Sequence, residues 1–285
     1  MSTTRIAVLD ALTEQLNGAG IEDARRNAEW ILEDVLGLTR AELYAHGEVS
    51  ITGREHEKAQ SLVERRLTRE PIQYVLGHTD FCGLRLKVSP AVLIPRPETE
   101  QVVEKVLHTI ESIKAPWVLD VGTGSGAIAV AIKEKRPDAE VFACDISDAA
   151  LEVAAENAAQ LGLDITFIHS DVLDPTFAND VSPAFDLVVS NPPYVPNNEH
   201  DTLQVEVRAY EPNIALFVPD DDPLRFYRAL SNLAPALLKP RGSLVVETHA
   251  DYGSEVVSLF KESGLVDVEL SMDLSGHPRI VTGCL

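Results

Sequence analysis

The sequence predicts an open α/β fold in which helices cover both faces of a mostly parallel sheet, preceded by a helical domain. From about residue 116 onward, apolar strand-like runs alternate with helical patterns, which is typical of repeated βα units. Up to about residue 77, the apolar residues recur only at helical spacing. The length of 285 residues suits two domains of modest size.

The first 77 residues predict a small helical domain. Residues 22–36 place apolar side chains on one face and are followed by a glycine, which often ends a helix. Thr39 with Glu42, and Thr52 with Glu55, have the spacing of capping boxes. These two pairs predict the beginnings of two further helices.

The next segment, residues 78–95, predicts a β-hairpin linker. Apolar and basic residues alternate over 84–88, which favours a strand, and a Ser-Pro pair favours a turn. The remaining 96–285 form the sheet domain. Its strands are predicted at residues 117–121, 140–145, 165–168, 185–190, 243–248, 266–271 and 279–283, and its helices at 126–136, 148–161, 223–238 and 253–263.

The charge limits the classes of partner. The formal net charge is −21, and no Lys or Arg lies between Arg136 and Arg208. Because phosphate binding depends on Lys and Arg, this argues against a general DNA or RNA binder. A small-molecule substrate or a basic protein partner fits the charge better.

Other features limit the compartment and the chemistry. The three cysteines lack CxxC spacing and the histidines lack ligand spacing, so we expect neither a disulfide framework nor a metal site. No apolar run is long enough to cross a bilayer, and the first residues do not have the pattern of a signal peptide. We therefore expect a cytoplasmic protein without membrane contact.

A glycine-rich turn follows the first predicted strand of the sheet. Residues 117–121 continue into Gly122-Thr-Gly-Ser-Gly126 and then into a helix, at the crevice where such sheets bind nucleotide-like ligands. Asp145 ends the next strand, where it can accept hydrogen bonds from ribose hydroxyls. A nicotinamide dinucleotide fits this pattern almost as well, and a tight turn without ligand is the third possibility. Asp120, just before the glycines, would repel a pyrophosphate and suits a cationic ligand such as S-adenosylmethionine.

A second motif, Asn191-Pro192-Pro193-Tyr194, follows the predicted strand 185–190 and faces the same crevice. The two prolines fix the backbone and remove two N–H donors. We expect the Asn191 side-chain oxygen and the Pro192 carbonyl to accept both hydrogens of a planar amino group, on which the Tyr194 ring stacks. Two such acceptors aim the nitrogen lone pair at a methyl donor and stabilise developing positive charge. Alone, the tetrapeptide would also fit a plain proline-rich turn.

Several segments together carry a family resemblance that spans almost the whole chain. They are residues 70–74 (EPIQY), 92–100 (VLIPRPETE), 120–128 (DVGTGSGAI), 190–195 (SNPPYV), 210–216 (YEPNIAL) and 273–276 (DLSG). The chain resembles the peptide chain release factor glutamine methyltransferases, which are class I S-adenosylmethionine-dependent methyltransferases with an NPPY motif. The resemblance implies a Rossmann-like, seven-stranded methyltransferase domain over 96–285. It also implies methylation of the side-chain amide nitrogen of the glutamine in the Gly-Gly-Gln motif of release factors, with S-adenosylhomocysteine as the other product.

The resemblance further implies the site residues. Cofactor binding falls on Asp120, Gly122, Thr123, Gly124, Ser125, Gly126, Asp145, Asp171 and Asn191. Substrate binding falls on Asn191, Pro192, Pro193 and Tyr194, of which Asn191, Pro192 and Tyr194 are the expected catalytic residues. Arg96, Glu98 and Thr99 would shape a lid over the cofactor, although Glu98 and Glu100 could simply begin a helix. The helical domain, 1–77, would recognise the protein substrate.

The sequence departs from the family pattern at three places, all of which concern loop shape. Val172 stands where some members carry an aromatic beside the adenine. Residues 217–223 lack the glycines that the family usually shows there, and His277-Pro278 is unusual before Arg279.

Other functions stay open at this point. An adenine-N6 methyltransferase acting on DNA or RNA would use the same loop, but it requires a basic groove and a target-recognition domain. A nicotinamide-dependent oxidoreductase leaves the loop unexplained, and a non-catalytic scaffold gives Asn191 no reason to face the crevice. We expect a monomeric enzyme that acts on release factors without contacting nucleic acid directly.

Overall fold

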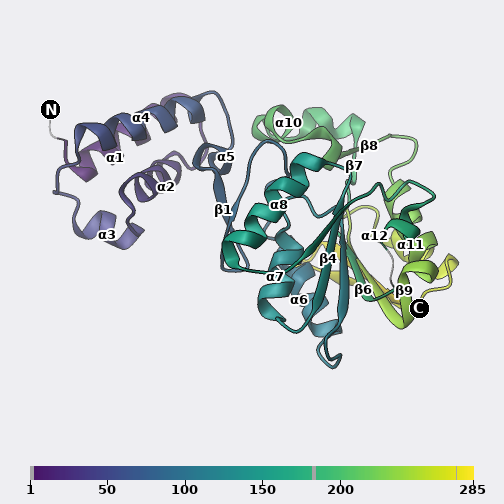
Figure 1. Cartoon of the computed structure of the whole chain (residues 1–285). Coiled ribbons are helices and arrows are strands. Elements are labelled where there is room, and N and C mark those ends of the chain that lie inside the picture. Colours follow the sequence, from purple (N-terminus) through teal and green to yellow (C-terminus); the bar gives the residue numbers. More distant parts are fainter. Residues whose placement is uncertain (1–2, 182–183, 274) are drawn as a thin grey trace. The chain divides into compact units, whose positions relative to one another are not determined.

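The computed structural model describes residues 3–181, 184–273 and 275–285. The chain forms two compact units (Figure 1). The first unit contains the residues up to Gly77 together with the distant segment Gln204–Tyr210, and the second contains His78–Leu203 and Glu211–Leu285. Nothing in the sequence pattern indicated that residues 204–210 join the first unit.

The first unit is a bundle of short helices around its own apolar core. They are α1 (Arg5–Gly18), α2 (Ala24–Leu36), α3 (Arg40–Ala45), α4 (Gly53–Leu67), α5 (Ile72–Leu76) and α10 (Val205–Tyr210). Both predicted capping boxes are confirmed, since the side chains of Thr39 and Thr52 accept from the backbone N–H of Glu42 and Glu55, and the two glutamates bond back. The core is built mainly from leucine, isoleucine, valine and alanine of α1, α2 and α4.

Helix α10 is joined to α4 by charge pairing and a hydrogen bond. The Arg66 guanidinium is buried and lies 2.9 Å from Glu206 Oε1, a residue 140 positions later in the chain. Arg69 pairs with the same carboxylate at 3.1 Å. The Tyr210 hydroxyl donates to the Thr68 carbonyl at 2.6 Å. A buried arginine without a partner is strongly unfavourable, so Glu206 completes this unit.

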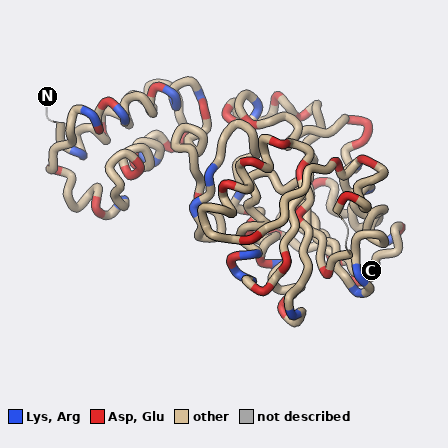
Figure 2. The backbone as a smooth tube through the Cα atoms, in the orientation of Figure 1, with Lys and Arg blue, Asp and Glu red and all other residues tan. Residues whose placement is uncertain are grey.

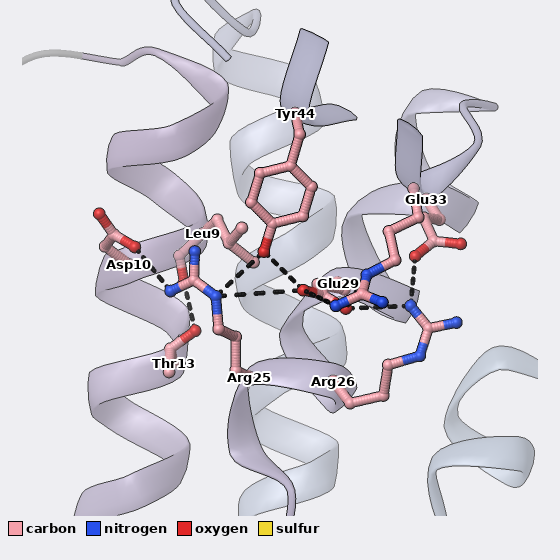
Figure 3. Close-up of polar contacts among 9 residues, drawn as sticks. Leu9, Asp10, Thr13, Arg25, Arg26, Glu29, Glu33 and Tyr44 are labelled. Carbon is pink, nitrogen blue, oxygen red and sulfur yellow. Dashed lines mark hydrogen bonds and ion pairs between the residues drawn. The ribbon is translucent and has the colours of Figure 1, made fainter. Parts of the chain in front are cut away.

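A buried carboxylate, Glu29, joins α2 to α3 (Figure 3). It accepts from the Tyr44 hydroxyl at 2.6 Å and pairs with Arg26 at 3.0 Å and Arg40 at 2.9 Å. Burial alone would raise the pKa of Glu29, but these three partners lower it below its usual value.

Replacing Glu29 by Ala should lower the free energy of unfolding of the first unit by about 1.5–3 kcal/mol, because it removes charge-assisted hydrogen bonds from arginines that are themselves partly exposed. The measurement is urea unfolding followed by Trp30 fluorescence in a Trp117→Phe background, since the chain has only two tryptophans. The lowered pKa means that this stabilisation is present above the unfolded-state pKa and is lost as the pH falls through the folded-state pKa.

Asp10→Ala, which removes the exposed partner of Arg25, is the control and should cost less than about 1 kcal/mol. Equal losses in both variants would contradict the role of Glu29.

The second unit is built on a seven-stranded sheet in the order β10-β11-β9-β6-β3-β4-β5. Its strands are β3 (Trp117–Val121), β4 (Glu140–Asp145), β5 (Thr166–His169), β6 (Phe185–Ser190), β9 (Leu238–Glu247), β10 (Val266–Met272) and β11 (Pro278–Cys284). The strands from β9 to β5 are parallel, and β11 is antiparallel to both of its neighbours. The predicted Rossmann-like, seven-stranded, mostly parallel sheet is therefore confirmed.

Helices cover both faces of this sheet, as predicted (Figure 1). One layer contains α6 (Thr99–Thr109), α7 (Ala127–Lys135) and α8 (Asp148–Leu161), whose valines, isoleucines and alanines face the sheet. The other layer contains α9 (Phe177–Asp180), α11 (Arg225–Leu237) and α12 (Gly253–Glu262), with the buried rings of Phe177, Tyr227 and Phe260. The two layers differ in residue size because the first packs small side chains closely beneath the glycine turn.

Shorter elements complete the second unit. The predicted hairpin is present as β1 (His78–Phe81) and β2 (Leu84–Lys87). Asn157 fastens it to α8, since its side chain accepts from Lys87 N at 2.6 Å and donates to Lys87 O at 3.0 Å. The sequence analysis missed the parallel pair β7 (Val195–Pro196) and β8 (Phe217–Val218), and the single turns η1 (Asn197–Thr202) and η2 (Asn213–Ala215).

Acidic residues are spread through the second unit (Figure 2). The stretch between Arg136 and Arg208 passes through β4, α8, β5 and β6 without a Lys or an Arg. Over the described ranges, no helix combines the length and the apolarity needed to cross a membrane.

Candidate active site

The register of four neighbouring parallel strands brings the predicted motifs to one edge of the sheet. Val121 in β3 lies opposite Cys144 in β4 and Ser190 in β6, and Ser190 lies opposite Val246 in β9. The Ser190 hydroxyl donates to the Val121 carbonyl at 2.7 Å and ties the ends of two of these strands together. The residues that come next on the four strands are Gly122, Asp145, Asn191 and Glu247.

A cavity of about 320 Å³ lies at this edge. Of the predicted site residues, it is lined by Gly122, Gly124, Asp145, Asp171, Asn191, Pro192 and Pro193. Another wall comes from Ala91, Val92 and Leu93, which precede the residues expected to form a lid. On a further side lie Phe217 of β8, which belongs to one of the departures from the family pattern, and Arg225 of α11, which the sequence did not indicate. The cavity is therefore bounded by both predicted motifs and by later parts of the chain.

Four other predicted cofactor residues are buried and do not line the cavity. Thr123, Ser125 and Gly126 belong to the turn, and Asp120 lies beneath it. Asp120 Oδ2 accepts from the Thr123 hydroxyl at 2.6 Å and from Ala129 N at 3.2 Å. Its Oδ1 is buried without a hydrogen-bond partner among the described residues. Burial raises the pKa of Asp120 to about 7, against the lowering effect of those two hydrogen bonds. Asp120 thus fixes the turn from below.

The glycines of the turn have two different functions. All three have positive φ, at +72° for Gly122, +55° for Gly124 and +78° for Gly126. A Cβ on Gly126 would lie 3.0 Å from Ala154 Cβ, so this glycine allows α7 and α8 to pack closely. A Cβ on Gly122 or Gly124 would meet no protein atom within 4 Å. These two glycines leave room on the side of the cavity.

Asp145 and Asp171 place carboxylates in the cavity wall. Asp145 accepts from Gly124 N at 2.9 Å through Oδ2 and from Ser147 N at 3.0 Å through Oδ1. Each carboxylate oxygen can accept more than one hydrogen bond, so both retain capacity for a ligand. Burial raises the pKa of Asp145, and the backbone N–H groups oppose this rise. Asp171 accepts from Leu173 N at 2.8 Å.

Asn191 belongs to a chain of buried side-chain hydrogen bonds. Its Nδ2 donates to Thr99 Oγ1 at 3.2 Å, and the Thr99 hydroxyl donates to Glu247 Oε2 at 2.7 Å. The Tyr194 hydroxyl donates to the other oxygen, Oε1, at 3.3 Å. Burial raises the pKa of Glu247, whereas Thr99, the positive charge of Arg279 and Tyr194 oppose this rise. The sequence analysis missed Glu247, although a carboxylate at the end of an otherwise apolar strand was a signal.

The segment expected to form a lid is fixed by specific contacts. Arg96 pairs with the buried carboxylate of Glu211 at 2.7 Å, and Glu211 also accepts from Ile94 N at 3.1 Å. Glu100 lies in the first turn of α6 and accepts from Cys82 N at 2.7 Å. Glu98 stands at the N-cap of α6 without a side-chain capping bond, so both acidic residues lie where this helix begins. Their part in a lid stays a prediction.

Two of the three departures from the family pattern touch the cavity. Val172 and Phe217 both line it, so the unusual residues take part in its shape. Asp273 pairs with Arg279 at 3.2 Å, close to Glu247, while Leu274 of the DLSG segment lies outside the described residues.

No group of three or more His, Cys, Asp or Glu side chains suited to a metal ion occurs in the part of the chain that the structure describes.

Comparison with known families first gives the class of protein. Residues 100–209 match the model of the methyltransferase small domain, and residues 7–77 match that of the PrmC N-terminal domain. A solved methyltransferase from Pyrococcus furiosus shares the fold at a TM-score of 0.50 and 15% identity, over 71% of this chain and 89% of that one. The fold and the domain match together define a methyltransferase.

Two curated relatives then give the family. The release factor glutamine methyltransferase of Geobacter sulfurreducens is 40% identical over 276 residues, which are 97% of this chain and 95% of the relative. That of Chlorobaculum tepidum is 42% identical over 266 residues, 91% of this chain and 90% of the relative. The chain belongs to the release factor glutamine methyltransferase family.

The two kinds of glycine in the turn should respond differently to substitution. Gly126→Ala should lower the free energy of unfolding by about 2–5 kcal/mol, because left-handed strain of about 1–2 kcal/mol adds to overpacking of about 1–3 kcal/mol against Ala154. Gly122→Ala, the matched control, should cost only the strain, about 1–2 kcal/mol. Denaturant unfolding of the second unit, followed by Trp117 fluorescence in a Trp30→Phe background, measures both. If Gly122→Ala were the more destabilising variant, the packing role of Gly126 would be wrong.

Proposed function

We propose that this chain transfers a methyl group from S-adenosylmethionine to the side-chain amide nitrogen of a glutamine in peptide chain release factors. The observation that carries the proposal is the position of Asn191 and Pro192 in the wall of a cavity that the glycine turn also lines. The two relatives compared above are both named release factor glutamine methyltransferase. The glutamine of the Gly-Gly-Gln motif, which the sequence resemblance implies, is the specific target proposed.

The residues of the cavity fit the cofactor. Gly122 and Gly124 leave backbone accessible where the methionine part would lie, and Asp120 holds that turn in place from below through Thr123 and Ala129. Asp145 keeps acceptor capacity for the two ribose hydroxyls, and Asp171 lies further along the wall for the adenine. When bound, S-adenosylmethionine supplies a methyl group attached to a positively charged sulfur.

The chemical difficulty is that an amide nitrogen is a poor nucleophile, because its lone pair is delocalised. Asn191 Oδ1 and the Pro192 carbonyl would accept the two amide hydrogens and thereby hold the lone pair toward the methyl carbon. As the nitrogen–carbon bond forms and the sulfur–carbon bond breaks, both acceptors stabilise the positive charge on nitrogen. One amide proton then leaves to these acceptors or to water. Orientation and electrostatics therefore carry the reaction, and no strong general base is required.

Tyr194 takes part differently from the sequence expectation. Its ring was expected to stack on the substrate amide, but it does not line the cavity, and its hydroxyl points to Glu247. In this structure the Tyr194 side chain packs with the apolar core on the α11–α12 side of the sheet. Stacking on the substrate stays a prediction, and support of the loop is what the contacts provide.

The rival functions are less well supported. Adenine methylation in DNA or RNA requires a basic surface, whereas the chain carries −21 and has no Lys or Arg between residues 136 and 208. A nicotinamide cofactor leaves the Asn191-Pro192-Pro193-Tyr194 loop in the cavity wall unexplained. We propose a monomeric cytoplasmic enzyme whose helical unit contributes to recognition of the release factor, because a glutamine side chain alone offers little contact area.

The direct test is methyl transfer from radiolabelled S-adenosylmethionine to a purified release factor, to its variant with the Gly-Gly-Gln glutamine changed to Ala, and to DNA and RNA. We expect label on the intact factor only. Asn191→Ala should reduce turnover by about 10²–10³-fold, because one of two aimed acceptors is lost. Its dissociation constant for the cofactor, measured by calorimetry, should change little. Label on nucleic acid and none on the factor would overturn the proposal.

The charge of the chain generates a second expectation. An acidic enzyme and a basic protein partner attract each other at long range, so their association rate constant should fall steeply as salt rises from 50 to about 500 mM. Stopped-flow measurement of binding to the release factor checks this, with small-molecule cofactor binding as the salt control. An association rate that does not depend on salt would show that the net negative charge of the chain has no part in docking.

A further inference from the structure

We propose that Thr99 and Glu247 are positioning residues that fix the orientation of the Asn191 side-chain amide, so that its oxygen and not its nitrogen faces the substrate. This proposal rests on the proposed function, because the orientation matters only for a substrate that offers N–H donors. It concerns two side chains that lie outside the Asn-Pro-Pro-Tyr motif and come from α6 and from the end of β9.

The proposal follows from a count of protons. A threonine hydroxyl has one hydrogen to donate, and an ionised carboxylate can only accept. The positive charge of Arg279 and the hydrogen bonds from Thr99 and Tyr194 favour the ionised form of Glu247. The Thr99 hydroxyl gives its hydrogen to Glu247 Oε2 at 2.7 Å, so toward Asn191 it can only accept. The Asn191 group that faces Thr99 at 3.2 Å must therefore be the Nδ2 amino group. Its Oδ1 is then directed away from Thr99, and Asn191 lines the cavity.

The opposite orientation would disable the site. If Thr99 donated to Asn191, the amide would rotate by half a turn and present its own N–H groups to the substrate. Two sets of donors would then face each other, and one of the two acceptors for the glutamine nitrogen would be lost. The two forms of asparagine differ little in shape, so packing alone does not choose between them; a defined hydrogen-bond chain does.

Burial makes this chain effective. Thr99 and Glu247 are 4% and 1% exposed, so water does not compete for their hydrogen bonds. The Glu247 carboxylate lies directly after Val246, which is paired with Ser190, the residue before Asn191. Its second oxygen accepts from the Tyr194 hydroxyl, three residues further along the loop. The Glu247 carboxylate thus binds Tyr194 at one end of the loop directly and Asn191 at the other end through Thr99.

The experiment compares Thr99→Val, Thr99→Ser and Glu247→Gln in the full-length chain. Thr99→Val removes the hydroxyl at nearly equal volume, and Glu247→Gln lets the new amide donate to Thr99, which frees the threonine hydrogen for Asn191. We expect kcat for methyl transfer to the release factor to fall about 10²-fold or more in both variants, with little change in KM for the factor. The cofactor dissociation constant should stay within about twofold of the unmodified enzyme. Thr99→Ser keeps the hydroxyl and should restore most of kcat.

The matched control is Thr109→Val, the same change in the same helix at a hydroxyl that bonds only its own helix, to Lys105 O. It should leave kcat unchanged. Full kcat in Thr99→Val or Glu247→Gln, or a loss in Thr99→Ser as large as in Thr99→Val, overturns the positioning role. Should Thr99→Val fail to fold, as judged by thermal unfolding, the volume-preserving Glu247→Gln carries the test. An unmodified enzyme that does not methylate the factor overturns the proposed function as well, whereas an active enzyme with unaffected variants overturns this inference alone.

Discussion

The common end point of four parallel strands is the constraint on which the rest of the site depends. In an open sheet of this kind, the carboxyl ends of parallel strands meet at one edge, and the chain there is free to form loops. Four neighbouring strands, β4, β3, β6 and β9, are paired in register up to the ends that face the site. A slip of one residue in any of these pairs would exchange the faces of the strand and remove a motif from the cavity.

Much of the fold was predictable because its signals are local. Repeated βα patterns, the capping boxes and the glycine turn each depend on residues close together in the sequence, and three strands, 117–121, 140–145 and 185–190, were predicted with the bounds that the structure shows. Gly122, Asp145 and Asn191 could be placed together because Asp145 ends a predicted strand and the other two directly follow one. The identity of the family depended on specific segments such as 92–100, which no argument from periodicity provides.

What could not be predicted depends on contacts between distant residues. Thr99 and Glu247 are separated by 148 positions, and neither has a neighbour in the sequence that indicates the other. Asp120 was expected to face the cofactor, but its burial beneath the turn depends on how α7 packs, since Ala129 of that helix binds its carboxylate. The pair β7 and β8 consists of two residues each, too short for any periodic signal.

Because Gln204–Tyr210 belongs to the helical unit, the order in which the protein folds during synthesis is affected. The buried Arg66 finds its carboxylate in Glu206, so the helical unit is complete only after residue 210 of 285 has left the ribosome. Domains near the amino terminus usually fold first, as independent units, while the chain is still growing. Here the first domain to emerge must wait for most of the second. A fragment that stops at Gly77 would lack the carboxylate that pairs with Arg66 and Arg69, and we expect it to be a poor substitute for the unit in the whole chain.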